Sequence, residues 1–248
     1  MSGAIVTSGD VIQAERAGAG LPDCFVVTID GQAATGKSSV GLRLAQRLGA
    51  AFLDTGAMYR DATALAIEHH AAPQDAEGIV RLVAQTRAGM DWVASPGNNY
   101  RGLDGAMNAR LRTPGVDAAV SIVARHEGLR LLLIDWQRGA ARAHKRLVTE
   151  GRDQGSRVFR ETALAKFFLM AEPGERARRR VEQLRAAGVA ADAGAIEANL
   201  RLRDAIDASH AMKIAEGMAV IDTTHLTEDA VVDRLAGLVL VQAGRAGV

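Results

Sequence analysis

The chain has 248 residues and a formal net charge of +1, so its overall charge gives no reason to expect nucleic acid or a membrane surface as a partner. Hydrophobic residues make up 48% and charged residues 24%, which is ordinary for a globular protein with one large core. Cys24 is the only cysteine, which excludes an intrachain disulfide and favours a cytoplasmic location. No apolar run approaches the ~20 residues of a membrane span.

Residues 1–22 lack the basic start and apolar middle of a signal peptide and are expected to form a flexible extension. Beyond them, short apolar runs alternate with helical patterns, which predicts an α/β fold with a parallel sheet covered on both faces. Five strands are predicted, at 25–30, 51–54, 146–150, 165–170 and 218–222. Helices are predicted at 38–48, 56–69, 75–86, 114–124, 127–143, 173–187 and 192–209, with a last one capped at 227–229.

The first predicted strand runs into Gly-Gln-Ala-Ala-Thr-Gly-Lys-Ser at 31–38, which matches the phosphate-loop pattern G-x-x-x-x-G-K-[ST]. A chain of this composition gives about 0.003 such matches by chance, so the motif predicts a nucleoside triphosphate site. Backbone N–H groups of the loop and the following helix would point at phosphate oxygens. Lys37 would reach the β- and γ-phosphates, and the Ser38 hydroxyl would ligate Mg²⁺.

Two further strand ends carry groups suited to an acceptor. Asp54, Thr55 and Arg60 follow the second strand, and Glu150-Gly-Arg-Asp153 ends the third. Ligands of open α/β sheets bind at the carboxyl ends of the strands, so the two arginines should converge on the crevice that holds Lys37. Arginines that grip an acceptor phosphate opposite a lysine on the donor are typical of phosphoryl transfer. A GTPase is disfavoured because no Asn-Lys-x-Asp element is present.

Two segments in the middle of the chain need a separate interpretation. Met90–Val93 and Tyr100–Leu103 flank a turn-rich segment and predict a small hairpin outside the main sheet. Leu131–Asp135 could be a strand that ends in a magnesium-binding aspartate, but a helical apolar stripe through it favours a helix.

The chain resembles the bacterial cytidylate kinases. The resemblance is carried by Ile-Asp-Gly-Gln-Ala-Ala-Thr-Gly-Lys-Ser at 29–38, Leu-Asp-Thr-Gly-Ala-Met-Tyr-Arg at 53–60 and Glu-Gly-Arg-Asp at 150–153, with further matches at 175–180, 203–207 and 220–224. It implies a three-layer α/β/α phosphate-loop fold and transfer of the ATP γ-phosphate to CMP or dCMP with Mg²⁺, in a monomer without a nucleic-acid or membrane partner. It also implies a division into an extension (1–22), core (23–62), nucleoside-monophosphate-binding subdomain (63–145), core (146–172), lid (173–212) and core (213–248).

The resemblance assigns roles to single residues. Lys37, Arg60, Arg152 and Asp153 would be catalytic. The triphosphate would contact the loop and the lid helix, through Gly31, Gln32, Ala33, Ala34, Thr35, Gly36, Lys37, Ser38, Ser39, Arg176, Arg179 and Arg180. The acceptor would contact Thr55, Arg60, Ser121, Arg130, Arg152, Asp153, Arg203, Asp207 and His210.

The chain departs from the family mostly on the acceptor side. His210 stands where the family has an arginine, the join to Val220 is about three residues short, and Gln32 replaces the usual proline. Histidine is mostly neutral at pH 7, so CMP binding is expected to be weakened and to improve as the pH falls toward 6. Two alternatives stay open: a phosphate-loop kinase for another small acceptor, and a nucleotide-binding module without turnover.

Overall fold

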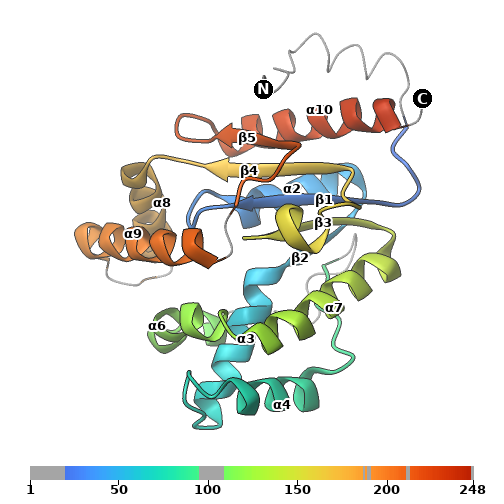
Figure 1. The fold of residues 1–248 in the computed structure, drawn as a ribbon. Coiled ribbons are helices and arrows are strands. Elements are labelled where there is room, and N and C mark those ends of the chain that lie inside the picture. Colours follow the sequence, from blue (N-terminus) through green and yellow to red (C-terminus); the bar gives the residue numbers. More distant parts are fainter. Residues whose placement is uncertain (1–19, 95–108, 187, 189–190, 211–212, 247–248) are drawn as a thin grey trace.

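The computed structural model describes residues 20–94, 109–186, 188, 191–210 and 213–246 (Figure 1). Its sheet has five strands in the order β2-β3-β1-β4-β5, and every neighbouring pair is parallel. The strands are β1 (Phe25–Gly31), β2 (Ala51–Asp54), β3 (Arg146–Gly151), β4 (Ala165–Met170) and β5 (Met218–Asp222). The predicted five-stranded parallel sheet is therefore confirmed.

Helices flank the sheet on both faces, and Figure 1 shows α8 and α9 as a separate pair beyond the ends of β1 and β4. The α-helices are α2 (Lys37–Leu48), α3 (Thr55–Glu68), α4 (Ala76–Arg87), α6 (Pro114–Val123), α7 (Glu127–His144), α8 (Pro173–Ala186), α9 (Ala193–His210) and α10 (Glu228–Ala246). A π-helix, η1 (Gln154–Val158), follows β3 and has no counterpart in the sequence prediction. Within the described part of the chain, no helix is both long and apolar enough to cross a membrane.

The central strand β1 is buried along its whole length because both of its faces are covered. Val27 and Ile29 pack into a core that includes α2 and α10, whereas Val26 packs into a second core with α3, α4 and α7. Side chains of a strand alternate between its faces, so this division gives the three-layer arrangement that the resemblance implies.

Several helix boundaries follow from local sequence signals. Thr113 caps α6 by accepting from the Val116 N–H, and Pro114 occupies the first helical position, where its missing N–H does no harm. Gly36 before α2 and Gly49 after it both adopt left-handed backbone angles. Leu131–Asp135 lies inside α7, which confirms the helical reading of that segment.

The segment around the predicted hairpin differs from expectation. Met90–Val93 forms no strand, and Ala94 instead makes an antiparallel bridge to Phe52 of β2, with N···O distances of 2.7 and 2.9 Å. The segment therefore returns to the edge of the main sheet, where the unpaired side of β2 offers hydrogen-bonding groups. Tyr100–Leu103 and residues 1–19 of the predicted extension lie outside the described residues.

Candidate active site

The loop between β1 and α2 is wound tightly by residues with positive φ angles. Gly31 (φ 144°), Ala34 (60°) and Gly36 (89°) turn the backbone, and a Cβ atom on Gly31 would lie 2.0 Å from the Leu169 carbonyl oxygen. Glycine at position 31 is thus required by the close approach of β4. The amides that begin α2 stand at a helix N-terminus, which favours a bound phosphate.

The side chains of Lys37 and Thr35 both fold back on the loop. Lys37 donates to the Gln32 carbonyl at 2.6 Å, which also accepts from the Thr35 hydroxyl at 2.9 Å. Lys37 is 7% exposed, so its ammonium group is held inside the loop, where an incoming phosphate can replace the carbonyl as its partner.

A pair of carboxyl groups lies beside Ser38. The Ser38 hydroxyl donates to Glu150 Oε1 at 2.6 Å, and Asp54 at the end of β2 caps α3 by accepting from the Ala57 N–H at 3.0 Å. Burial is the main cause that raises the pKa of Glu150, and the neighbouring Asp54 carboxyl raises it further. A cation placed here would relieve both effects, and a hydroxyl with carboxylates suits Mg²⁺. The described residues hold no group of three histidine, cysteine or carboxylate side chains that could enclose a metal by themselves.

Arg152 links the acceptor side to the phosphate loop. Its Nη1 donates to the Gly31 carbonyl at 2.5 Å, across the boundary between β3 and β1. Asp153 pairs with Arg130 of α7 instead of with its neighbour Arg152. Burial raises the pKa of Asp153, and the positive charges of Arg130 and Arg157 oppose that shift. Arg152 and Asp153 therefore lie at the end of β3, and Arg130 of α7 reaches the same place through its ion pair with Asp153.

Arg60 extends from α3 toward α6. Its Nη1 donates to the Leu111 carbonyl at 3.0 Å and its Nη2 to Asp117 Oδ1 at 2.8 Å. Thr55, at the start of the same helix, is buried and donates its hydroxyl to the Glu150 carbonyl at 2.7 Å. In this structure Thr55 thus ties α3 to β3.

The three lid-helix arginines predicted to contact the triphosphate point to different places. Arg176 is 1% exposed and joins the Ala33 carbonyl (3.4 Å) to Asp204 of α9 (2.7 Å). Arg179 donates to the Thr223 carbonyl at 2.6 Å, beside the phosphate loop. Arg180 faces α6 instead, with its Nη2 3.6 Å from Asp117 Oδ2.

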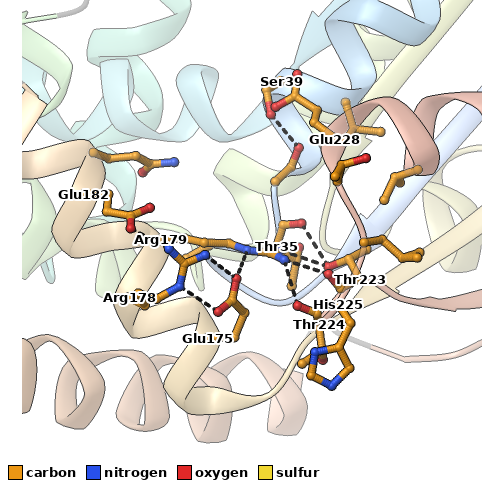
Figure 2. A pocket seen from close by; sticks show the side chains of 17 residues that line it. Thr35, Ser39, Glu175, Arg178, Arg179, Glu182, Thr223, Thr224, His225 and Glu228 are labelled. Atoms are coloured by element: carbon orange, nitrogen blue, oxygen red, sulfur yellow. Dashed lines mark hydrogen bonds and ion pairs between the residues drawn. The ribbon is translucent and has the colours of Figure 1, made fainter.

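A cavity of about 560 Å³ opens between the phosphate loop, α8 and the segment that joins β5 to α10. Figure 2 shows Glu175 between Arg178 and Arg179 on one side, with Thr223, Thr224 and His225 close by and Thr35 on the loop. The volume lies within the range of small-ligand sites. Because the cavity continues from the loop, it can hold the remainder of a triphosphate nucleotide.

The remaining predicted acceptor residues lie on α6 and α9. Ser121 is half-buried on α6, and its carbonyl accepts from Arg125 at 3.2 Å. Arg203, Asp207 and His210 all belong to α9, but their side chains lie outside the described part of the structure.

Three aspartates at the site were missing from the sequence prediction. Asp30 is buried and accepts from the backbone N–H groups of Gln154 and Gly155, both at 2.8 Å. Its position directly before the phosphate loop was the available signal. Asp204 stands beside Arg203 in the matched motif, and Asp117 gave no signal because its partners come from distant segments.

Comparisons with known proteins identify relatives of this chain. A family model described as cytidylate kinase matches residues 27–240. A cytidylate kinase of Mycolicibacterium paratuberculosis is 39% identical over 86% of this chain and 94% of its own. A cytidylate kinase of Symbiobacterium thermophilum is 40% identical over 85% of this chain and 94% of its own. A bifunctional pantoate ligase/cytidylate kinase of Synechococcus elongatus is 39% identical over 86% of this chain and 41% of its own.

Proposed function

This chain belongs to the cytidylate kinase family, and from that premise we propose that it transfers the γ-phosphoryl group of ATP to CMP or dCMP. An oxygen of the acceptor phosphate forms a bond to the γ-phosphorus. The bond from that phosphorus to the bridging oxygen breaks, and ADP leaves with the bonding electrons. Little covalent help is needed, so the protein must align two anions and offset their charge.

The observation that carries the proposal is the contact between Arg152 and Gly31. A guanidinium group at the end of β3 lies against the first residue of the phosphate loop, 2.5 Å from its carbonyl. An acceptor phosphate bound by Arg152 would therefore stand next to a triphosphate bound by the loop. We assign Lys37 to the donor phosphates, and Arg60 and Arg152 to the acceptor phosphate.

The donor nucleotide would occupy the loop and the cavity beside it. Residues 31–39 would surround the phosphates, and Arg179 lies where it could contact the same nucleotide from the lid. Mg²⁺ would be held at Ser38 near Glu150 and Asp54, with water and phosphate oxygens as its remaining ligands. When bound, the metal would neutralise charge that develops on the phosphoryl oxygens.

The acceptor nucleotide would lie between the end of β3, α6, α7 and the lid. The Arg130–Asp153 pair offers a charged donor and acceptor for the base or sugar. Ser121, Arg203, Asp207 and His210 are assigned to the same nucleotide from the family motifs. We further propose that the protein acts as a cytoplasmic monomer, with residues 63–145 as the acceptor-binding subdomain and 173–212 as the lid.

The proposal is tested by measuring ADP release from Mg-ATP with CMP, dCMP, UMP, AMP and shikimate as acceptors. We expect CMP and dCMP to give the highest kcat/KM. Greatest activity with another acceptor would overturn the substrate assignment, and no acceptor-stimulated release would point to a module without turnover.

Arg152 provides a sharper test of the assigned geometry. Arg152→Gln should lower kcat/KM for CMP about 100-fold or more, since it removes a charged group that would lie against the reacting phosphates. Arg185→Gln, at an exposed position of α8, is the matched control and should retain wild-type kinetics. A variant at Arg152 with wild-type kinetics would contradict its role.

A further inference from the structure

One carboxylate, that of Asp117, lies between two arginines from different elements. Its Oδ1 accepts from Arg60 of α3 at 2.8 Å, and its Oδ2 lies 3.6 Å from Arg180 of α8. The side chains of Arg60, Arg180 and Asp117 are 14%, 21% and 33% exposed, so the group is only partly open to water. Asp117 thus connects α3, α6 and α8.

Among the described residues, the group formed by Arg60, Arg180 and Asp117 has two positive charges and one negative charge. Burial lowers the pKa of Arg180, the Asp117 carboxylate opposes that shift, and the charges of Arg112 and Arg60 add to it. Arg60 and Arg180 thus share the Asp117 carboxylate, and the charge of Arg112 also acts on Arg180. Such an arrangement favours an additional or stronger anion.

The position of Arg60 indicates which anion that is. Under the proposed function, Arg60 binds the acceptor phosphate, yet both of its terminal nitrogens are engaged with α6 and the segment before it. A phosphate that approaches Arg60 would also approach the Asp117 carboxylate. The two groups are both anions and repel each other, and both form paired hydrogen bonds with a guanidinium group. Arg60 therefore cannot bind the phosphate and the Asp117 carboxylate well at the same time.

We propose that Asp117 is an internal competitor of the acceptor phosphate, a residue that sets acceptor affinity by holding Arg60 and Arg180 while no acceptor is bound. The acceptor phosphate takes over these guanidinium groups, and Asp117 is released toward solvent. Arg180 is then an acceptor-side residue, unlike Arg179, which faces the donor cavity. This inference rests on the proposed function, because it assumes that Arg60 binds the acceptor.

The test compares Asp117→Asn with the wild type. Asparagine keeps the shape and one hydrogen-bond acceptor for Arg60 but removes the negative charge. Glu77→Gln is the matched control, since it removes one carboxylate from the exposed part of α4. We expect the KM for CMP to fall about fivefold or more in Asp117→Asn, with the KM for ATP unchanged and Glu77→Gln like the wild type. Should Asp117→Asn fail to fold, Asp117→Ser is measured in the same way.

An unchanged or higher KM for CMP in the variant would overturn the inference, because Asp117 would then be a structural or orienting partner of Arg60. A second measurement separates this failure from that of the proposed function. Inorganic phosphate is titrated into both proteins while the unfolding midpoint is followed. A larger stabilisation of Asp117→Asn supports the inference even if the wild type does not phosphorylate CMP, and equal stabilisation overturns it.

Discussion

Asp30 stands at the end of β1, immediately before the phosphate loop, and is completely buried. Its two oxygens accept from the N–H groups of Gln154 and Gly155, so it fixes the start of η1 against the central strand. Burial raises its pKa to about 6, although both backbone hydrogen bonds favour the charged form. The residue therefore makes a contribution to stability that changes with pH.

The direction of that change follows from proton binding. The pKa of Asp30 is raised from 3.8 to about 6 on folding, so between pH 4 and pH 6 the folded state binds more protons than the unfolded state. Stability then falls as the pH rises through this range. Relative to Asp30→Asn, the wild type should lose about 2 to 3 kcal/mol of unfolding free energy between pH 4 and pH 7.

Urea unfolding at several pH values measures this difference, because the other carboxyl groups titrate in both proteins and cancel. Asp23→Asn removes a fully exposed carboxyl group and controls for the loss of one charge. A difference between wild type and Asp30→Asn that stays constant with pH would show that Asp30 is ionised in the folded state throughout.

The predictability of site residues depended on whether a local pattern marks them. Lys37, Ser38, Arg60 and Arg152 sit at fixed offsets from strand ends, so short motifs suffice to propose them as site residues. Asp117 instead acquires its role from Arg60 and Arg180, which are 57 and 63 residues away along the chain. No sequence period encodes such a meeting, so only the folded arrangement reveals it.

Among the elements, η1 is the one that positions the end of β3. It lies across β1, where the amides of Gln154 and Gly155 meet Asp30 and Gly155 lies close to Thr28 of that strand. A Cβ atom on Gly155 would lie 2.6 Å from the Thr28 hydroxyl oxygen and 2.7 Å from Met218 Cε. Thr28 is buried and stiff at χ1, so it cannot move aside easily.

Gly155→Ala is therefore expected to lower the unfolding free energy by about 1 to 3 kcal/mol, because a methyl group is forced into a packed contact. It should also raise the KM for CMP, since η1 follows directly from Arg152 and Asp153. Thermal unfolding and steady-state kinetics check both effects. Gly174→Ala, in the first turn of α8 with open space around it, is the matched control and should be neutral or slightly stabilising.

The five strands and most helices could be predicted because their apolar patterns are strong. The order β2-β3-β1-β4-β5 was not predicted, since strand pairing depends on contacts between distant segments. The π-helix was missed because five residues are too few to display a period. The bridge between Ala94 and Phe52 was not predicted, because a single bridge leaves no alternating pattern in the sequence around it.

At the scale of the whole molecule, one buried arginine connects α8 and α9 to the core. Arg176 of α8 donates to the Ala171 carbonyl (3.1 Å) and to the Ala33 carbonyl in the phosphate loop (3.4 Å), and it pairs with Asp204 of α9. Gln32 of the loop contacts the same Asp204 oxygen at 3.4 Å, a contact that the proline usual in the family could not make. Contacts of Arg176 and Asp204 thus tie α8 and α9 to the phosphate loop.

Asp204→Asn should weaken that coupling. Removing the negative charge leaves the Arg176 guanidinium buried with only neutral acceptors, which is expected to lower the unfolding free energy by about 3 kcal/mol. Because Ala33 and Gln32 belong to the proposed donor site, we also expect the KM for ATP to rise more than the KM for CMP. Thermal unfolding with and without Mg-ATP, together with kinetics for both substrates, measures these effects.

The control for this variant is Glu197→Gln, which breaks an ion pair with Arg201 on the same helix. That pair lies near the surface, so its loss should change the unfolding free energy by less than about 1 kcal/mol and leave both KM values unchanged. If Asp204→Asn loses stability but keeps the wild-type KM for ATP, Asp204 only holds α8 and α9 together. A raised KM for ATP would support the view that the contacts of Asp204 with Arg176 and Gln32 shape the phosphate loop.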